Sequence, residues 1–329
     1  MSAQWKQRPE GGGWFAIWII RAIGRHGGRT LARALLYPIT LYFLLRRGPE
    51  RRASRAWLSV ALARRASWLD VARHIHCFAS TILDRVFLLS GEVRRFAIRV
   101  VGVEALHARI DAGQGVLLFG SHLGSFEVLR VLARERPQAR LRVVLDQGHN
   151  PAVTQLLDAL NPEIAANVID ASQHGPALML QIHEAIAAGE MVALLVDRIH
   201  PGETALPVPF FGREAPLSRA PWQLAMVLGA PVMLAFGLYR GGNRYDLVFE
   251  PFSDGEPVPR PQRAARIAAL IAGYAGRLEH HARSAPFNWF NFYDYWSDTQ
   301  GVEAMAPAAG IAGGDAGGGL RHGAPARRA

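Results

Sequence analysis

The sequence contains a single cysteine, Cys77, among its 329 residues, so the chain cannot form an internal disulfide. It also lacks the glycine patterns of Walker and dinucleotide-binding loops, and it has no Gly-x-Ser-x-Gly motif and no internal repeat. Lys6 is its only lysine, so arginine supplies almost all of its positive charge. These absences argue against disulfide-stabilised secreted proteins, nucleotide-binding enzymes, α/β serine hydrolases and repeat proteins.

Long hydrophobic runs are also missing. Both apolar runs near the amino terminus are shorter than the roughly 20 residues that a membrane-spanning helix needs. The first covers residues 14–20 and stops at Arg21, and the second covers residues 34–45, where Pro38 is expected to kink a helix. Tryptophan and tyrosine in these runs favour a membrane interface. We therefore expect interfacial helices, or one tilted helix that spans poorly.

Positive charge is concentrated in residues 1–55. This segment has eleven basic and two acidic residues, and it supplies nearly all of the net charge of +10. Basic residues interleaved with apolar runs indicate an anionic membrane as the partner, rather than nucleic acid. If a span forms, the arginines after residue 45 keep the rest of the chain on the cytoplasmic face. A cleaved signal peptide and a buried helical hairpin are the competing interpretations of this segment.

The remaining chain alternates short apolar runs with helical patterns, after a helical stretch at residues 57–89. This order predicts an α/β fold with a mixed, mostly parallel sheet flanked by helices, preceded by amino-terminal membrane-associated helices. The expected strands are residues 115–120, 141–145, 167–170, 191–196, 232–238 and 245–250. The expected helices are residues 127–134, 153–160, 177–188, 219–228 and 263–283.

Composition divides the chain into three parts. Residues 1–55 form the basic amphipathic segment, residues 56–298 the α/β domain, and residues 299–329 a tail of glycine, alanine and arginine that is expected to be disordered. Within the α/β domain, residues 115–120 and 191–196 show no polar alternation, which is typical of central strands covered on both faces.

The segment Gly120-Ser-His-Leu-Gly-Ser-Phe-Glu127 is the most informative in the chain. His122 follows the carboxyl end of an expected strand, where α/β enzymes place their active sites, and Glu127 falls in the first turn of the next expected helix. Residues five apart do not share a helix face, so the two side chains meet only if His122 lies in the turn before the helix. Gly124 permits such a turn, and Ser125 is a suitable N-cap. A carboxylate on one imidazole nitrogen would leave the other as a general base for a hydroxyl group.

The remaining polar clusters carry less weight. His74, His76 and Cys77 are poorly spaced for zinc, because residues i, i+2 and i+3 of a helix point in different directions, so no metal is expected. His280 and His281, near the end of an expected helix, are interpreted as solvated. Arginines within residues 260–266 suggest a surface that could meet an acidic carrier protein.

Three motifs resemble one enzyme family. Residues 120–128 resemble the His-x4-Glu/Asp motif of the bacterial lipid A biosynthesis acyltransferases, the lauroyl and myristoyl transferases within the lysophospholipid acyltransferase superfamily. Residues 192–198 (VALLVDR) and 207–221 (PVPFFGREAPLSRAP) resemble the strand-Asp segment and the Val-Pro-Phe-Phe-Gly block of that family. Residues 286–296 (PFNWFNFYDYW) resemble its aromatic carboxyl-terminal end. The resemblance covers about residues 15–297, and the motifs are fairly specific in this order.

The resemblance implies a glycerolipid-acyltransferase-like fold and an acyltransferase at the cytoplasmic face of the inner membrane. It implies transfer of a fatty acyl chain from an acyl carrier protein or acyl-CoA thioester to a hydroxyl of a lipid A precursor or related glycolipid, with no other cofactor. His122 would be the general base, oriented by Glu127. Asp197 and Arg198 would shape the acceptor or phosphate site, since arginine suits phosphate recognition. The residues expected to bind substrate are Asn150, Asp197, Arg198, Gly202, Phe210, Phe211, Gly212, Ser218 and Arg219.

The sequence departs from the family pattern at two places. Residues 145–162 keep Asn150 but lack an arginine that the family usually has, and Ser218 and Ala220 stand where relatives often have threonine and glycine. These differences leave the acceptor open, including one from an aryl-polyene or other lipid pathway. Two further functions fit the same residues. One is a lipid hydrolase in which His122 activates water, and the second is a non-catalytic peripheral protein that binds lipid.

Overall fold

A computed structural model describes residues 14–129, 131–132, 140–146, 166–173, 175–200 and 203–296, with residues 14–27 and 173 described by their backbone alone. Four predictions lie outside these residues, namely the helix at 153–160, the site residues Asn150 and Gly202, and the tail 299–329.

The seven-stranded sheet is mixed and mostly parallel, as predicted. Neighbouring strands run parallel in every pairing except that of β8 with β9. All the predicted strands are present, whereas β1 and a separate hairpin of β6 (Ala205–Phe210) and β7 (Arg213–Ser218) were not predicted. Across the sheet the order is β1 (Ala97–Val101), β9 (Arg244–Ser253), β8 (Val232–Tyr239), β2 (Val116–Gly120), β5 (Met191–Leu195), β3 (Leu141–Leu145) and β4 (Val168–Asp170).

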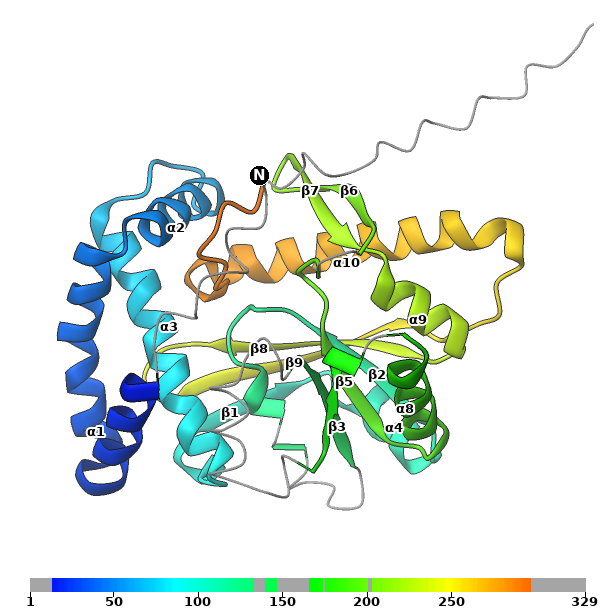
Figure 1. The fold of residues 1–329 in the computed structure, drawn as a ribbon, viewed down its shortest axis with the longest axis horizontal. Coiled ribbons are helices and arrows are strands. Elements are labelled where there is room, and N and C mark those ends of the chain that lie inside the picture. The colour runs from blue at the N-terminus through cyan, green and yellow to red at the C-terminus, as the bar shows by residue number, and fades with distance from the viewer. Residues whose placement is uncertain are drawn as a thin grey trace, which may run out of the picture.

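Helices flank the sheet (Figure 1). The helices are α1 (Trp14–Arg46), α2 (Gly48–Ala61), α3 (Trp68–Leu89), α4 (Glu104–Asp111), α8 (Pro176–Ala187), α9 (Ala220–Leu228) and α10 (Arg263–Ser284). Of these, α1, α2 and α3 lie at one side of the sheet, α8 and α4 at the other, and α10 along one face (Figure 1). The 3-10 turns are η1 (Val93–Arg95), η2 (Phe126–Leu129), η3 (Ala171–Gln173), η4 (Arg260–Gln262) and η5 (Pro286–Asn288). The predicted helical stretch 57–89 is divided because α3 has its own start, a capping box of Ser67 and Asp70.

The central strand β2 shows why its sequence lacks polar alternation. Leu117 and Phe119 enter one hydrophobic core, whereas Val116 and Leu118 enter a second core on the other face. All four side chains are fully buried, as expected of a strand that is covered on both sides. Helix α10 crosses one face of the sheet, and α1, α2 and α3 stand together beside it (Figure 1).

The amino-terminal helix α1 is interrupted at Gly28, where φ is 69° and ψ is 172°. The helical backbone continues through Pro38. A proline removes one hydrogen bond of the helix, whereas the positive φ of Gly28 takes the backbone out of the helical region altogether. Arg29 anchors the helix through two hydrogen bonds of 2.8 and 2.9 Å to the buried Asp84 of α3. In the part of the chain that the structure describes, none of the helices has the length and apolar character needed to cross a membrane.

Candidate active site

His122 and Asp197 lie side by side because two neighbouring strands end at the same level. Strand β2 pairs in parallel with β5, and Gly120 stands opposite Leu195. His122 and Asp197 each follow two residues later. The Asp197 carboxylate accepts hydrogen bonds from the His122 backbone N–H at 3.1 and 3.0 Å, and its Oδ1 lies 2.7 Å from His122 Nδ1.

The Asp197 carboxyl is ionised although it is fully buried. Burial would raise its pKa, but the charge and hydrogen bonds of His122, the nearby charge of Arg198 and a hydrogen bond from Trp289 lower the pKa to about 2. An ionised carboxylate only accepts hydrogen bonds, so Nδ1 of a neutral His122 ring must carry the proton. That tautomer leaves a lone pair on Nε2, which is what a general base requires. The His122 side chain is 28% exposed, whereas that of Asp197 is 0% exposed.

The aromatic residues 286–296 hold this pair in place. Trp289 Nε1 donates to Asp197 Oδ2 at 3.0 Å, and the Tyr295 hydroxyl donates to the Asp197 carbonyl at 3.1 Å. The Phe290 backbone N–H donates to the His122 carbonyl at 2.9 Å. The segment therefore contacts both members of the pair and fixes the backbone that carries them.

The turn after His122 depends on Gly124. Its φ is +82°, and a Cβ there would lie 2.0 Å from the carbonyl oxygen of Gly237, so no other residue fits without a shift of the backbone. The next residue, Ser125, donates its backbone N–H to that same carbonyl at 2.8 Å. The predicted turn is thus present, and the close approach of β8 explains why it needs glycine.

Glu127 lies on the 3-10 turn η2, where its carboxylate contacts Ser125 and Arg85. Its Oε2 accepts a hydrogen bond from Ser125 Oγ at 2.8 Å, and its Oε1 lies 2.5 Å from Arg85 Nε of α3. The sequence favoured Glu127 as the orienting carboxylate, but the structure places Asp197 on Nδ1 of His122. The physical reason is that Asp197 is in register on the adjacent strand, while η2 turns Glu127 toward the arginine. A catalytic role for Glu127 stays a prediction.

Arg198 binds the aromatic segment. Its Nε donates to Asn291 Oδ1 at 2.9 Å, its Nη2 donates to the Phe290 carbonyl at 3.1 Å, and its guanidinium carbon lies 5.8 Å from the centre of the Tyr293 ring. These contacts hold residues 290–293 beside the His122 turn. The expected role of Arg198 in phosphate recognition stays a prediction.

The Phe-Phe-Gly block forms the turn of the β6–β7 hairpin. Phe211 and Gly212 have φ values of 52° and 72°, the left-handed pair that a tight hairpin turn demands. Phe210 and Phe211 are both buried, with ring centres 5.2 Å from Trp289 and 5.1 Å from Trp57 respectively. The block packs against the aromatic segment, and its contact with substrate stays a prediction.

Ser218 and Arg219 join the hairpin to α9. Ser218 is fully buried, and its Oγ accepts the Ala220 backbone N–H at 3.2 Å. Arg219 is the N-cap residue of α9, and its backbone N–H donates to the Thr204 carbonyl at 3.0 Å. Both residues have roles in the fold, and their predicted roles in substrate binding are untested.

The histidines near Cys77 have separate partners. His74 is fully buried and bonds to Ser54 and to the Trp289 carbonyl, whereas His76 Nδ1 lies 3.2 Å from Thr40 Oγ1. Within the described ranges, no three His, Cys, Asp or Glu residues are grouped so that they could hold a metal ion.

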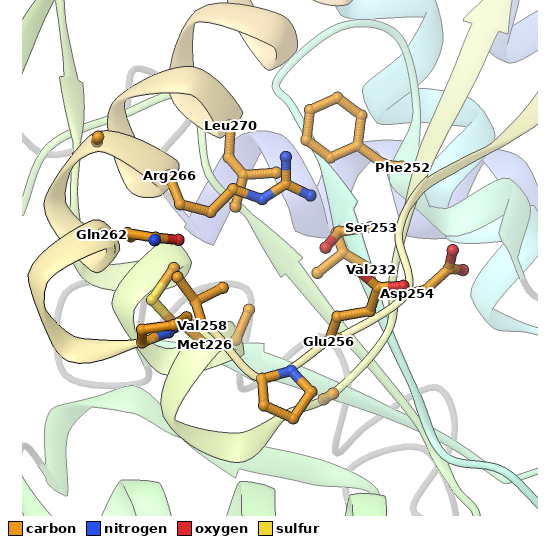
Figure 2. A pocket seen from close by; sticks show the side chains of 16 residues that line it. Met226, Val232, Phe252, Ser253, Asp254, Glu256, Val258, Gln262, Arg266 and Leu270 are labelled. Atoms are coloured by element: carbon orange, nitrogen blue, oxygen red, sulfur yellow. The ribbon is translucent and has the colours of Figure 1, made fainter.

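A cavity of about 580 Å³ lies away from His122, between α9, α10 and the end of β9 (Figure 2). Val232 lines it at the start of β8, beside Leu117, so the cavity is at the amino ends of the parallel strands. Arg266 reaches over it from the first turn of α10 (Figure 2). The other end of this helix leads into the aromatic segment, and 22 helical residues span about 33 Å. A carrier protein docked on residues 260–266 would therefore be remote from His122.

Sequence reasoning missed the parts played by Asp197 and Trp289 in holding His122. The available signal for Asp197 was its place directly after the expected central strand 191–196, much as His122 follows the expected strand 115–120. The signal for Trp289 was only the density of aromatic residues in 286–296.

The family described as bacterial lipid A biosynthesis acyltransferase matches residues 74–297 of the chain. This span includes His122, Asp197 and the aromatic segment, and it begins inside α3. No curated protein matches the chain.

Proposed function

The chain belongs to the bacterial lipid A biosynthesis acyltransferase family and is an acyltransferase, and from this premise we propose that it moves a fatty acyl chain from an acyl carrier protein or acyl-CoA thioester to a hydroxyl of a lipid A precursor or related glycolipid. The observation that carries the proposal is the pair of His122 and the buried Asp197 at the carboxyl ends of two central strands, inside the matched span. The reaction requires a base for a hydroxyl, and the tautomer set by Asp197 provides one.

In the proposed reaction, Nε2 of His122 removes the proton of the acceptor hydroxyl as its oxygen bonds to the thioester carbonyl carbon. The tetrahedral intermediate then expels sulfur by breaking the carbon–sulfur bond. The proton passes from the imidazolium to the leaving sulfur, so the products are an ester and a free thiol. Asp197 stabilises the imidazolium that forms between these steps, because it is a buried anion at 2.7 Å.

Glu127 supports the same site from the side of α3. Its hydrogen bond from Ser125 and its ion pair with Arg85 connect the turn after His122 to that helix. We expect this contact to hold the turn when substrate binds, and Glu127 to affect the rate less than Asp197 does.

We also place the enzyme on the cytoplasmic face of the inner membrane, bound through α1. Tyr37, Leu41 and Leu45 follow one another at intervals of four residues, and each is more than half exposed. The Arg51 guanidinium, which donates to the Leu44 carbonyl at 2.6 Å, lies 5.0 Å from the centre of the exposed Trp68 ring. Apolar side chains beside arginine and tryptophan suit the surface of an anionic membrane.

Sedimentation with vesicles that contain anionic lipid tests this placement. The triple variant Y37S/L41S/L45S should lose most of its vesicle binding. The matched control L180S/V227S removes two equally exposed apolar side chains from α8 and α9 and should bind as the wild type does. Equal binding by all three proteins would contradict a membrane contact through α1.

The catalytic proposal is tested with purified protein, acyl carrier protein thioester or acyl-CoA, and a lipid acceptor. Release of free thiol together with an acylated lipid, detected by mass spectrometry, is the expected result. Free fatty acid in place of acylated lipid would show a hydrolase that uses His122 to activate water. Vesicle binding without any turnover would show a peripheral lipid-binding protein. Acylation of a different lipid class, such as an aryl-polyene precursor, would keep the chemistry and change the acceptor.

A further inference from the structure

We propose that Trp289 is a positioning residue for the catalytic base, because its indole N–H fixes the carboxylate that in turn fixes His122. The proposal rests on the proposed function, since it assigns a residue to the same reaction. Trp289 Nε1 lies 3.0 Å from Asp197 Oδ2, and Asp197 Oδ1 lies 2.7 Å from His122 Nδ1. The indole and the imidazole therefore bind opposite oxygens of one carboxylate.

Burial makes the indole hydrogen bond important. Trp289 is 1% exposed and Asp197 is 0% exposed. Water cannot replace a lost donor in such a site, and an unsatisfied buried carboxylate oxygen is costly. Among the residues that the structure describes, loss of the indole N–H would therefore leave Oδ2 with the His122 backbone N–H, at 3.0 Å, as its hydrogen-bond donor. The carboxylate would then be held from the side of His122 alone, and the imidazole ring would be less firmly directed.

Trp289 is itself held from several sides, so its N–H points at a defined place. His74 Nε2 donates to the Trp289 carbonyl at 3.0 Å. A short antiparallel bridge joins Trp289 to Leu123, the residue after His122. The indole ring lies 4.5 Å from that of Trp57 and 4.6 Å from that of Tyr295, measured between ring centres. Packing and hydrogen bonds thus fix both the backbone and the ring.

The indole donor also sets the proton affinity of the His122–Asp197 pair. A hydrogen bond to a carboxylate stabilises its negative charge and weakens its attraction for protons. Removal of that donor should increase the negative charge felt by the imidazole and favour the imidazolium. His122 would then lose its proton only at a higher pH, and below that pH it could not act as a base.

The test replaces Trp289 by phenylalanine and uses Trp222 as the matched control. Trp222 is also fully buried and packs against three aromatic rings, those of Phe119, Phe252 and Tyr274. Its Nε1 has no hydrogen-bond partner among the residues that the structure describes. W289F and W222F therefore remove similar packing, but only W289F removes a donor to Asp197.

We expect W289F to lower kcat by about 10- to 100-fold, because misdirection of a catalytic group has effects of this size. The KM values for donor and acceptor should change little, and the acid limb of the rate profile should move to higher pH. W222F should leave the acid limb in place. A loss of kcat in W289F that W222F matches, with no movement of the acid limb, would overturn the proposal.

Nuclear magnetic resonance separates this proposal from the proposed function. The midpoint of the His122 imidazole titration should rise in W289F and stay unchanged in W222F, whether or not an acyl acceptor has been found. A wild-type protein without acyl transfer would refute the proposed function, while an unmoved titration midpoint would refute the role of Trp289. If W289F does not fold, benzothienylalanine at position 289 keeps the ring size and replaces the N–H by sulfur, and the same shift is expected.

Discussion

Two histidine–carboxylate pairs in this protein have nearly equal nitrogen–oxygen distances but different surroundings. His122 Nδ1 lies 2.7 Å from Asp197 at the carboxyl ends of the strands, and His281 Nε2 of α10 lies 2.8 Å from Glu250 of β9. In both pairs burial raises the pKa of the carboxyl, and nearby positive charge together with hydrogen bonds lowers it to about 2. Bond length and acid strength therefore do not distinguish the two pairs.

Exposure and competing partners do distinguish them. The His122 side chain is 28% exposed above a fully buried acid, whereas His281 is 8% exposed and its acid is 20% exposed. Glu250 also binds Arg277 at 2.6 and 2.7 Å, and the His281 ring packs 4.3 Å from that of Phe236. The first pair presents an imidazole and hides its carboxylate, as a catalyst must. The second hides the imidazole and shares the carboxylate, which suits a role in joining α10 to the sheet.

Alanine at the two histidines should give the largest contrast. H122A should lose turnover by about 10²–10⁴-fold, because it removes the general base. H281A should keep turnover and lose stability by about 1–3 kcal/mol, because Glu250 loses a buried partner. Thiol-release assays and urea unfolding of both variants measure the two effects. Full turnover in H122A would remove the basis of the proposed function.

Amides at the two acids should give the next largest contrast. D197N keeps the shape but can present an amide N–H to Nδ1, which favours the wrong tautomer, so we expect a loss of turnover of about 100-fold. E250Q should leave turnover within a few-fold of the wild type and unfold at a lower urea concentration. A loss of turnover in E250Q as large as that in D197N would erase the distinction between the pairs.

Local sequence signals were sufficient to predict most strands of the large sheet and the place of His122 at the end of one of them. Apolar runs located every strand of the sheet except β1, and the same pattern placed His122 at a strand end. These runs could not show that β2 and β5 are neighbours. In the sequence β3 lies between them, whereas in the sheet β3 lies on the far side of β5 from β2. Once that order is known, alignment of Val116 with Met191 brings His122 beside Asp197.

Long-range contacts decided what the sequence could not. Glu127 was an attractive partner for His122 at a distance of five residues, but Arg85 approaches it from α3. His281 was interpreted as solvated together with His280, yet the structure buries His281 and leaves His280 exposed. The β6–β7 hairpin was missed because its strands are proline-rich, with a turn at Phe211 and Gly212 that takes an unusual backbone for phenylalanine.

E127Q should have a smaller effect on turnover than D197N. The variant keeps the size of the side chain and weakens its attraction to Arg85, which loosens the turn after His122 without removing the acceptor on Nδ1. We expect a loss of about tenfold, a typical size for modest misplacement of a catalytic group. R85K is the companion variant, because it keeps the charge that faces Glu127. A larger loss in E127Q than in D197N would return the orienting role to Glu127.

The smallest expected effect is on stability in acid, where the two pairs should behave alike. A carboxyl whose pKa is lowered by folding contributes stability above its unfolded pKa, about 4, and that contribution is lost as the pH falls toward the folded value of about 2. The stability difference between wild type and E250Q should therefore shrink between pH 4 and pH 2, as should that between wild type and D197N. Urea midpoints across this range measure both differences. A difference that stays constant for either variant would mean that its carboxyl is not stabilised as an anion. The two pairs would then differ in their electrostatics as well as in their exposure.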